Sequence, residues 1–492
     1  MDSTNTKISQ LYAALFGRAP DWEGLQYWKY LMDLGQMAVV ADQMFATAPA
    51  RAYFPNEATN EQVIASFYVN VLGRIADAEG LAFWTAQLNK PGATPGSVIS
   101  AMIDVIAHYT GTDPAGLVSA ALFNNRTAAA QFYAEGGGSV ANATQVLAGV
   151  TAQAQSVLDA RVIEMQNVGG QVNVGGYTDI TLSNLTGNLE LSNVADGAVF
   201  HIGQGVGNFY VLAHMHNDNE VVAGNDLSVH LAPNNDFSTL TLLAISVDDL
   251  TLVMPPAESA TPLGNHVNLS SISHLDSLVV TGEAPGGLLL SYVNADVVDL
   301  SGFVGSVGVN AAAVGRVIGS SGADEIYANG TVGSVEAGAG NDILGGRGAV
   351  KLLGGAGADR FIFSDHPELQ LPIVGDFKKG TDTLDLHPLV TNFSYPNPNV
   401  GADFDYGTWY SKKISLASGA SFNAYLNAAA SKQPSSTHAA ITWFQHGGDA
   451  YVVVDNSYAQ STFQNGADRH IKLVGVTDLS TLTFDSAQGL LH

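Results

Sequence analysis

The chain contains no cysteine, so neither disulfide bonds nor thiol chemistry can contribute to its fold or its function. It also contains no run of 18 or more apolar residues, and we therefore expect no transmembrane segment. The N-terminal segment MDSTNTKISQLYAALFGR lacks a basic region followed by an apolar region. A conventional signal peptide needs both, so none is expected here.

Basic residues are scarce, with 19 Lys and Arg against 45 Asp and Glu, which gives a formal net charge of −26. Not one Lys or Arg occurs between Arg161 and Arg316. This balance argues against nucleic acid as a partner, because nucleic-acid binding needs basic patches. It favours solubility and divalent cations, although any soluble acidic protein would share this composition.

The motifs of several enzyme classes are missing. No H-E-x-x-H, no G-x-S-x-G and no Gly-Lys dipeptide occurs, which removes the usual signatures of zinc proteases, α/β-hydrolases and P-loop proteins. We therefore expect no enzymatic activity. One enzyme class stays open, because a β-solenoid that acts on polysaccharides can carry acidic catalytic residues without such a motif.

Residues 1–167 are predicted to form an α-helical domain, because apolar residues recur there at a spacing of three to four. Residues 11–28 recur as residues 67–84, with an offset of 56 throughout. Each copy predicts a helix that ends at a glycine, Gly17 or Gly73, which suits a left-handed C-cap.

A second helix is predicted to begin in each copy near an aspartate, Asp21 or Asp77, which suits an N-cap. Arg18 and Arg74 are expected to tie the intervening turn to a nearby carboxylate.

Aromatic residues follow in each copy. Trp28 and Trp84 are expected to pack in the core, with stacking on sugar rings as the alternative. A weaker echo of the repeat covers residues 123–133, and residues 146–166 predict a closing helix.

Short alternating apolar runs replace the helical pattern in residues 168–318. Residues 180–185 are followed nine residues later by the similar residues 189–194. Such short strands, separated by Gly, Asn and Asp, predict an acidic β-solenoid or an elongated sandwich. His214 and His216 would face the same side of a strand and could share a metal, but two histidines without a third ligand are weak evidence.

Residues 319–363 contain three segments with the pattern G-x-D-x-apolar, whose aspartates are 18 and then 17 residues apart. Glycine allows tight turns that aim carbonyls at one point, and the aspartate adds a carboxylate. Such hard oxygen donors suit Ca²⁺, which takes six to eight of them. The predicted ligand-bearing positions are Gly322, Asp324, Gly340, Asp342, Gly357 and Asp359.

Two nine-residue units would make one turn of a coil, so residues 18 apart should stack. The three aspartates would then line one edge, while the apolar residues Ile326, Leu344 and Phe361 would point into the coil. The opposite edge carries Gly333 and Val350 at the corresponding positions, so its sites are degenerate. We predict two calcium ions between successive turns on the intact edge.

Residues 364–492 are predicted to form a C-terminal β cap. Phe377, Leu384 and Leu386 would cover the open end of the coil, and Asp382 is a candidate for an additional calcium ligand. Further on, residues 441–444, 451–455 and 471–476 predict antiparallel strands, with a turn at Gly447, Gly448 and Asp449.

These motifs resemble those of RTX proteins. The repeated aspartate segments resemble the calcium-binding nonapeptide G-G-x-G-x-D-x-U-x. Residues 371–386 resemble the D-x-I-x-D-F-x-x-G-x-D-x-L-D-L segment that follows such repeats, although Leu371 or Pro372 replaces its first aspartate. Residues 8–90 resemble a helical domain of unassigned function that is common in RTX-type and surface-layer proteins, and distantly resemble phycobilisome linker domains.

The order of elements resembles RTX-type surface-layer (S-layer) proteins of Gram-negative bacteria, such as that of Caulobacter. The resemblance implies a mostly-β solenoid or β-roll behind an α-helical domain that binds lipopolysaccharide or another surface glycan. It further implies folding by Ca²⁺, self-assembly into a two-dimensional lattice, and type I secretion directed by the C-terminal region. The protein would then be secreted and lie at the cell surface. The alternative is a secreted RTX adhesin or glycan-binding protein.

Overall fold

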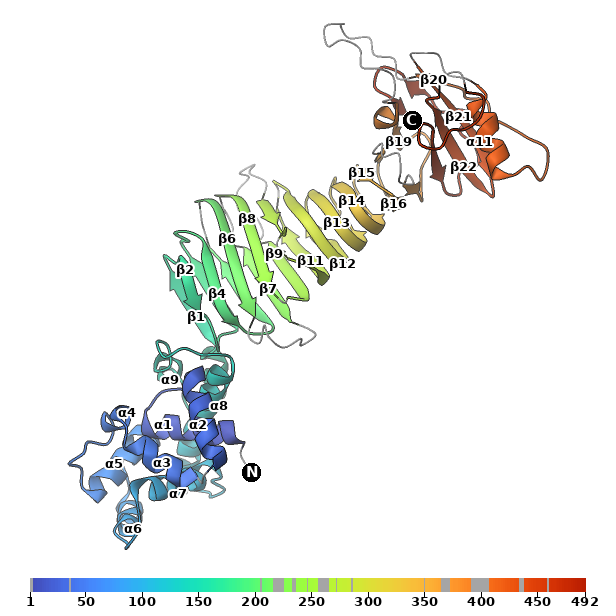
Figure 1. The fold of residues 1–492 in the computed structure, drawn as a ribbon. Coiled ribbons are helices and arrows are strands. Elements are labelled where there is room, and N and C mark those ends of the chain that lie inside the picture. The colour runs from blue at the N-terminus through green and yellow to red at the C-terminus, as the bar shows by residue number, and fades with distance from the viewer. Residues whose placement is uncertain are drawn as a thin grey trace. The chain divides into compact units, whose positions relative to one another are not determined.

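In the computed structural model, N-terminal helices are followed by a β-solenoid of about 9 turns (Figure 1). Two compact units divide the chain, one formed by residues 1–202 and 212–227 and the other by residues 203–211 and 228–492. The structure describes residues 3–34, 37–203, 206–215, 225–231, 236–245, 247–254, 265–270, 272–284, 286–348, 350–363, 372–390, 407–432, 438–457 and 460–492.

The first unit begins with a cluster of helices whose caps match the internal repeat. Gly17 and Gly73 both have positive φ, 62° and 67°, as expected for glycines that end a helix. The helices are α1 (Thr4–Leu15), α2 (Trp22–Leu34), α3 (Met37–Phe45), α4 (Ala48–Arg51), α5 (Asn60–Asn70), α6 (Ala78–Leu88), α7 (Pro95–Ala107), α8 (Pro114–Glu135), α9 (Gln145–Ala148) and α10 (Gln155–Asp159).

The predicted turn between the paired helices is confirmed in both copies. Asp21 accepts a hydrogen bond from the Gly24 amide and Asp77 accepts one from the Gly80 amide. Arg18 and Arg74 each lie 3.1 Å from the aspartate of their own copy. The same sequence thus gives the same cap twice.

A third copy of this cap begins α8. The side chain of Asp113 accepts a hydrogen bond from the Gly116 amide at 2.7 Å. The segments D-W-E-G-L, D-A-E-G-L and D-P-A-G-L share the pattern D-x-x-G-L, which was the sequence signal for this third helix start.

Two expectations for residues 1–167 need correction. The predicted closing helix over residues 146–166 is wrong, because only α9 and α10 are helical there and Val162–Gln166 forms strand β1. In β1 exposed and half-buried residues alternate, which is a strand period that the mixed composition had hidden. Trp28 is buried as expected, but Trp84 is only half-buried.

Parallel pairing defines the strands of the solenoid. In the first unit β1 pairs with β3 (Asp179–Ser183), β3 pairs with β5 (Ala198–Ile202), and β2 (Gly170–Asn173) pairs with β4 (Leu189–Val194), all in parallel. Pairing with the next strand but one means that consecutive strands lie on different faces of the coil. Buried and less buried residues alternate along β3 and β5, so each turn buries one row of apolar side chains.

Strands of the second unit also pair in parallel. One long strand, β12 (Leu288–Val304), pairs with β13 (Val307–Ile318). The other solenoid strands are β6 (Val206–Met215), β7 (Asp226–Leu231), β8 (Asp236–Ile245), β9 (Asp249–Met254), β10 (Asn265–Asn268), β11 (Leu275–Glu283), β14 (Glu325–Glu336), β15 (Ile343–Gly346), β16 (Lys351–Leu353), β17 (Arg360–Phe363), β18 (Ile373–Val374) and β19 (Thr383–Asp385).

The C-terminal region contains the predicted antiparallel strands. β21 (Ala439–His446), β22 (Asp449–Asp455) and β23 (Arg469–Leu473) pair in this order. Two further pairings connect this region to the last solenoid strands, β18 with β23 and β19 with β25. The remaining elements are the 3₁₀ helix His387–Leu389, β20 (Gly407–Trp409), α11 (Phe422–Ala430), β24 (Phe484–Asp485) and β25 (Leu490–Leu491).

Candidate metal centre

The register of four strands places the repeated aspartates in one column. Ile326 of β14 lies beside Leu344 of β15, which lies beside Phe361 of β17. Phe361 in turn lies beside Leu384 of β19. All four side chains are fully buried, as predicted for the first three. The aspartate two positions before each of them therefore occupies the same place in successive turns.

Hydrogen bonds connect these aspartates directly. The Asp324 amide donates to Asp342 Oδ1 at 2.8 Å, and the Asp342 amide donates to Asp359 Oδ1 at 3.1 Å. The Asp359 amide donates to Asp382 Oδ1 at 3.2 Å. We call these four residues the aspartate column. All four side chains are at most 1% exposed, so four carboxylates are buried along one edge of the coil.

The carboxylates at the two ends of the column, Asp324 and Asp382, accept hydrogen bonds from backbone amides outside the column. Asp324 Oδ1 accepts from the Val307 amide and Asp324 Oδ2 from the Ser320 amide, at 2.8 and 2.7 Å. Asp382 Oδ2 accepts from the Lys378 amide at 2.7 Å. Both carboxylates thus have protein donors on both of their oxygens.

The two central carboxylates differ from the ends, because each keeps one oxygen without a partner. Asp342 Oδ2 and Asp359 Oδ2 are both buried and accept no hydrogen bond from any residue that the structure describes. A buried carboxylate oxygen without a donor is costly unless a cation or a proton compensates it. The donor set therefore fits a metal ion at the middle of the column.

The pKa values of the column aspartates are raised, as expected for buried carboxylates that lie close together. Burial, together with the charges of Asp324 and Asp359, raises the pKa of Asp342 to about 6. The pKa values of Asp324, Asp359 and Asp382 are also raised above the ordinary value of an aspartate, and burial is the main cause in each case. Column carboxylates are therefore costly to ionise without a cation, and a divalent cation would remove that cost.

Glycines bring successive turns close together. Gly340 and Gly357 have φ of 136° and 141°, which an L side chain rarely adopts. A Cβ on Gly357 would lie 1.6 Å from the Gly340 carbonyl oxygen. Gly322 differs, because it has no positive φ; a Cβ there would instead lie 2.3 Å from the Gly305 carbonyl oxygen. All three glycines thus allow a carbonyl of the preceding turn to approach, and carbonyl oxygens are also calcium donors.

One acidic residue beside the column was not predicted as part of the site. Asp376 accepts hydrogen bonds from the Gly354 and Gly355 amides, both at 2.9 Å. It belongs to the D-F-x-x-G-x-D segment, so its position in that motif was the available signal. It holds the glycine turn that precedes Asp359.

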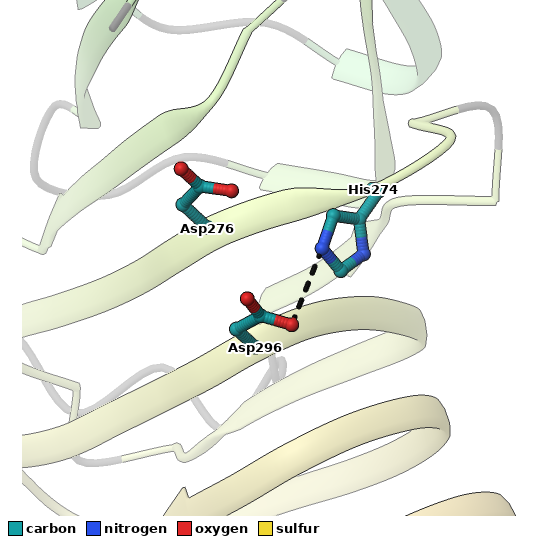
Figure 2. A group of neighbouring side chains, drawn as sticks. All are labelled: His274, Asp276 and Asp296. Carbon is teal, nitrogen blue, oxygen red and sulfur yellow. Dashed lines mark ion pairs between the residues drawn. The ribbon is translucent and has the colours of Figure 1, made fainter. Parts of the chain in front are cut away.

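A separate group of candidate ligands lies on adjacent solenoid turns (Figure 2). His274, Asp276 and Asp296 each offer an atom within 4.8 Å of the others, and His274 Nε2 lies 3.3 Å from Asp296 Oδ1. All three side chains are exposed, so water can satisfy them and no ion is needed. Their separation in sequence hid this group from sequence reasoning.

The predicted histidine pair can be followed only in part. His214 Nε2 lies 3.1 Å from Glu190 Oε1, and His216 lies outside the described residues.

Comparison with known proteins informs the helical region. A family model described as a domain of unknown function (DUF4214) matches residues 41–105. This segment runs from α3 into α7 and includes the second copy of the internal repeat. No curated protein matches the chain. Among the described residues, no helix has the length and apolar character needed to cross a bilayer.

Proposed function

We propose that the protein is an exported structural protein that Ca²⁺ folds outside the cell and that assembles into a surface-layer lattice. The observation that carries the calcium part is the pair of buried, unpartnered oxygens at Asp342 and Asp359. The lattice part is supported by the resemblance to RTX-type surface-layer proteins. The proposed role is structural and requires no catalytic site.

Dependence on calcium would restrict folding to the outside of the cell, where the calcium concentration is high. Extracellular calcium sites have Kd of about 10⁻⁴–10⁻³ M, so they stay empty at cytosolic calcium concentrations. A site filled at about 100 times its Kd adds roughly 2.7 kcal/mol to the free energy of unfolding. The residues that would hold the ions are Asp342 and Asp359, with glycine carbonyls of the neighbouring turns as further donors. The bound ion would supply the positive charge that the buried column needs.

Export and capping are proposed for residues 364–492. The pairings of β18 with β23 and of β19 with β25 support a cap, because they cover the last edges of the parallel coil. Type I secretion through this region rests on the family resemblance alone.

Anchoring to lipopolysaccharide or another surface glycan is proposed for residues 1–167. Aromatic side chains stand exposed on the repeat, with Tyr27 at 59%, Tyr30 at 66% and Phe83 at 56%. Tyr27 and Phe83 occupy equivalent positions of the two copies, and each ring packs edge-on against the tryptophan that follows it. Rings held in this way can stack on sugars. The same observation favours the second candidate function, a secreted adhesin.

Electron microscopy of the purified protein tests the assembly. With millimolar calcium we expect sheets or tubes, because calcium screens or bridges chains that each carry a net charge of −26. Chelation with EGTA should dissolve them. Monomers that persist in calcium would contradict the lattice, and broad binding to foreign sugars on a glycan array would then favour the adhesin.

A further inference from the structure

A second pair of buried carboxylates lies where a loop joins the two C-terminal strands β22 and β23. Asp455 is the last residue of β22, and Asp468 directly precedes β23. The neighbouring residues Val454 and Arg469 are paired across the two antiparallel strands. Asp455 is 0% exposed and Asp468 is 3% exposed, so both carboxylates are removed from water.

Asp468 is held by donors from the loop between the two strands. Its Oδ1 accepts from the amides of Asn456 and Ser457, both at 3.0 Å, and its Oδ2 accepts from the Gln464 amide at 2.7 Å. The Ser457 hydroxyl donates to the same carboxylate. These donors fix the position of the Asp468 carboxylate.

The neighbouring carboxylate of Asp455 has fewer hydrogen-bond donors than that of Asp468. Its Oδ1 accepts from the Ser457 amide at 3.0 Å, whereas its Oδ2 is buried and has no hydrogen-bond partner within the described part of the chain. Burial, followed by the charge of Asp468, raises the pKa of Asp455. No ion pair of the described residues includes either carboxylate.

A further acceptor follows in the chain. Asn456 is buried, and its Nδ2 donates to the carbonyls of Leu389 and Ala467 at 2.9 and 3.0 Å. Both amide hydrogens are thereby used, while Asn456 Oδ1 is buried without a donor. Two adjacent residues thus each carry one buried oxygen that no donor of the described residues satisfies.

We propose that Asp455 and Asp468 hold a hard divalent cation, of which Ca²⁺ is the best match, with Asn456 Oδ1 as a neighbouring oxygen donor. Carboxylate and amide oxygens are the ligands that this ion prefers. A proton shared between the two carboxylates would relieve their repulsion but would leave Asn456 Oδ1 without a partner. The ion would fix the loop between β22 and β23. This site is distinct from the aspartate column and does not depend on it.

The test counts bound calcium in the full chain by elemental analysis after gel filtration in calcium. Asp455→Asn keeps the shape of the side chain and removes its charge, so it should bind one ion fewer than the wild type. The matched control is Asp478→Asn, which removes an exposed charge from the same region and should leave the count unchanged. The column variant Asp342→Asn provides a second background, in which Asp455→Asn should again remove one ion.

Thermal unfolding gives an independent readout. In EGTA, Asp455→Asn should melt at or above the wild-type temperature, because it removes a buried charge beside Asp468. In millimolar calcium the order should reverse, with the wild type more stable. An equal ion count in both backgrounds, or an order of melting temperatures that calcium does not change, would overturn the proposal in favour of a shared proton.

Discussion

The Asp324 amide donates a hydrogen bond of 2.8 Å to Asp342 Oδ1, one full turn further along the coil. The same bond recurs one turn later, where the Asp342 amide donates to Asp359 Oδ1. Each aspartate therefore uses one oxygen to fix the turn before it. The other oxygen remains available for an ion at Asp342 and Asp359, but not at Asp324.

Asp342→Asn should remove most of the calcium-dependent stability at its site. The variant keeps the side-chain oxygen that accepts the Asp324 amide but loses the charge that attracts the ion. The gain in unfolding free energy between EGTA and saturating calcium should fall by about 2–3 kcal/mol. Denaturant unfolding in both buffers measures it.

The control for this variant lies in the same column. Asp324→Asn replaces a carboxylate whose two oxygens accept from protein groups, so an Asn amide must face the Val307 or Ser320 amide. We expect a loss of stability of about 1–3 kcal/mol in EGTA and in calcium alike. Equal calcium dependence of the two variants would contradict the assignment of the ions to the central aspartates.

The pH dependence should change sign with calcium. In EGTA the folded-state pKa of Asp342, about 6, lies above its ordinary value, so the folded protein binds the proton more tightly. Its contribution to stability is therefore fully present below about pH 4 and is lost as the pH rises through about 6, at about 1.4 kcal/mol per pKa unit. In calcium, protons compete with the ion, and stability should rise over the same range.

The comparison with Asp342→Asn isolates this contribution from the other carboxylates. Both proteins are unfolded with denaturant at pH 4, 5, 6 and 7 in EGTA. The stability of the wild type relative to the variant should decrease with rising pH. A difference that stays constant or increases would contradict a raised pKa.

Gly357→Ala should destabilise the coil whether or not calcium is present. Its φ of 141° is unfavourable for alanine, and the new Cβ would collide with the Gly340 carbonyl oxygen. We expect a loss of more than about 2 kcal/mol. The matched control is Gly348→Ala, where φ is 76° but nothing lies within 4 Å of the added Cβ, and its loss should be near 1 kcal/mol.

The helix caps of the internal repeat should differ in strength although their geometry is the same. The Asp21 side chain is 12% exposed, whereas the Asp77 side chain is 55% exposed. Asp21→Ala should cost about 2 kcal/mol and Asp77→Ala about 1 kcal/mol, because the capping hydrogen bond of Asp21 is partly buried and that of Asp77 is exposed to water. Urea unfolding of the two variants measures the difference, and equal losses would contradict the role of burial.

The sequence predicted those features that repeat at a fixed spacing. The 56-residue offset predicted the caps at Gly17 and Gly73, and the offsets of 18 and 17 predicted that Asp324, Asp342 and Asp359 lie in successive turns. Asp382 is 23 residues beyond Asp359, and the motif rather than the spacing indicated it. The structure shows that it ends the column.

Features that do not repeat at a fixed spacing in the sequence were not predicted. Asp455 and Asp468 are 13 residues apart and meet only because the hairpin of β22 and β23 brings its ends together. The strand Val162–Gln166 was mistaken for a helix, because its half-buried face is mixed in composition. Which column oxygens remain unpartnered also depends on the backbone amides of Val307 and Lys378, and no motif specifies that these amides act as donors.

A crystal structure of the full chain grown in calcium tests the central claim most directly. The account predicts ions between successive turns, within about 2.3–2.6 Å of Asp342 Oδ2 and of Asp359 Oδ2. Anomalous scattering from a lanthanide soaked into the same crystals would confirm these positions. A calcium-grown structure in which both oxygens lack an ion, and accept instead from a protein donor or carry a proton, would contradict it.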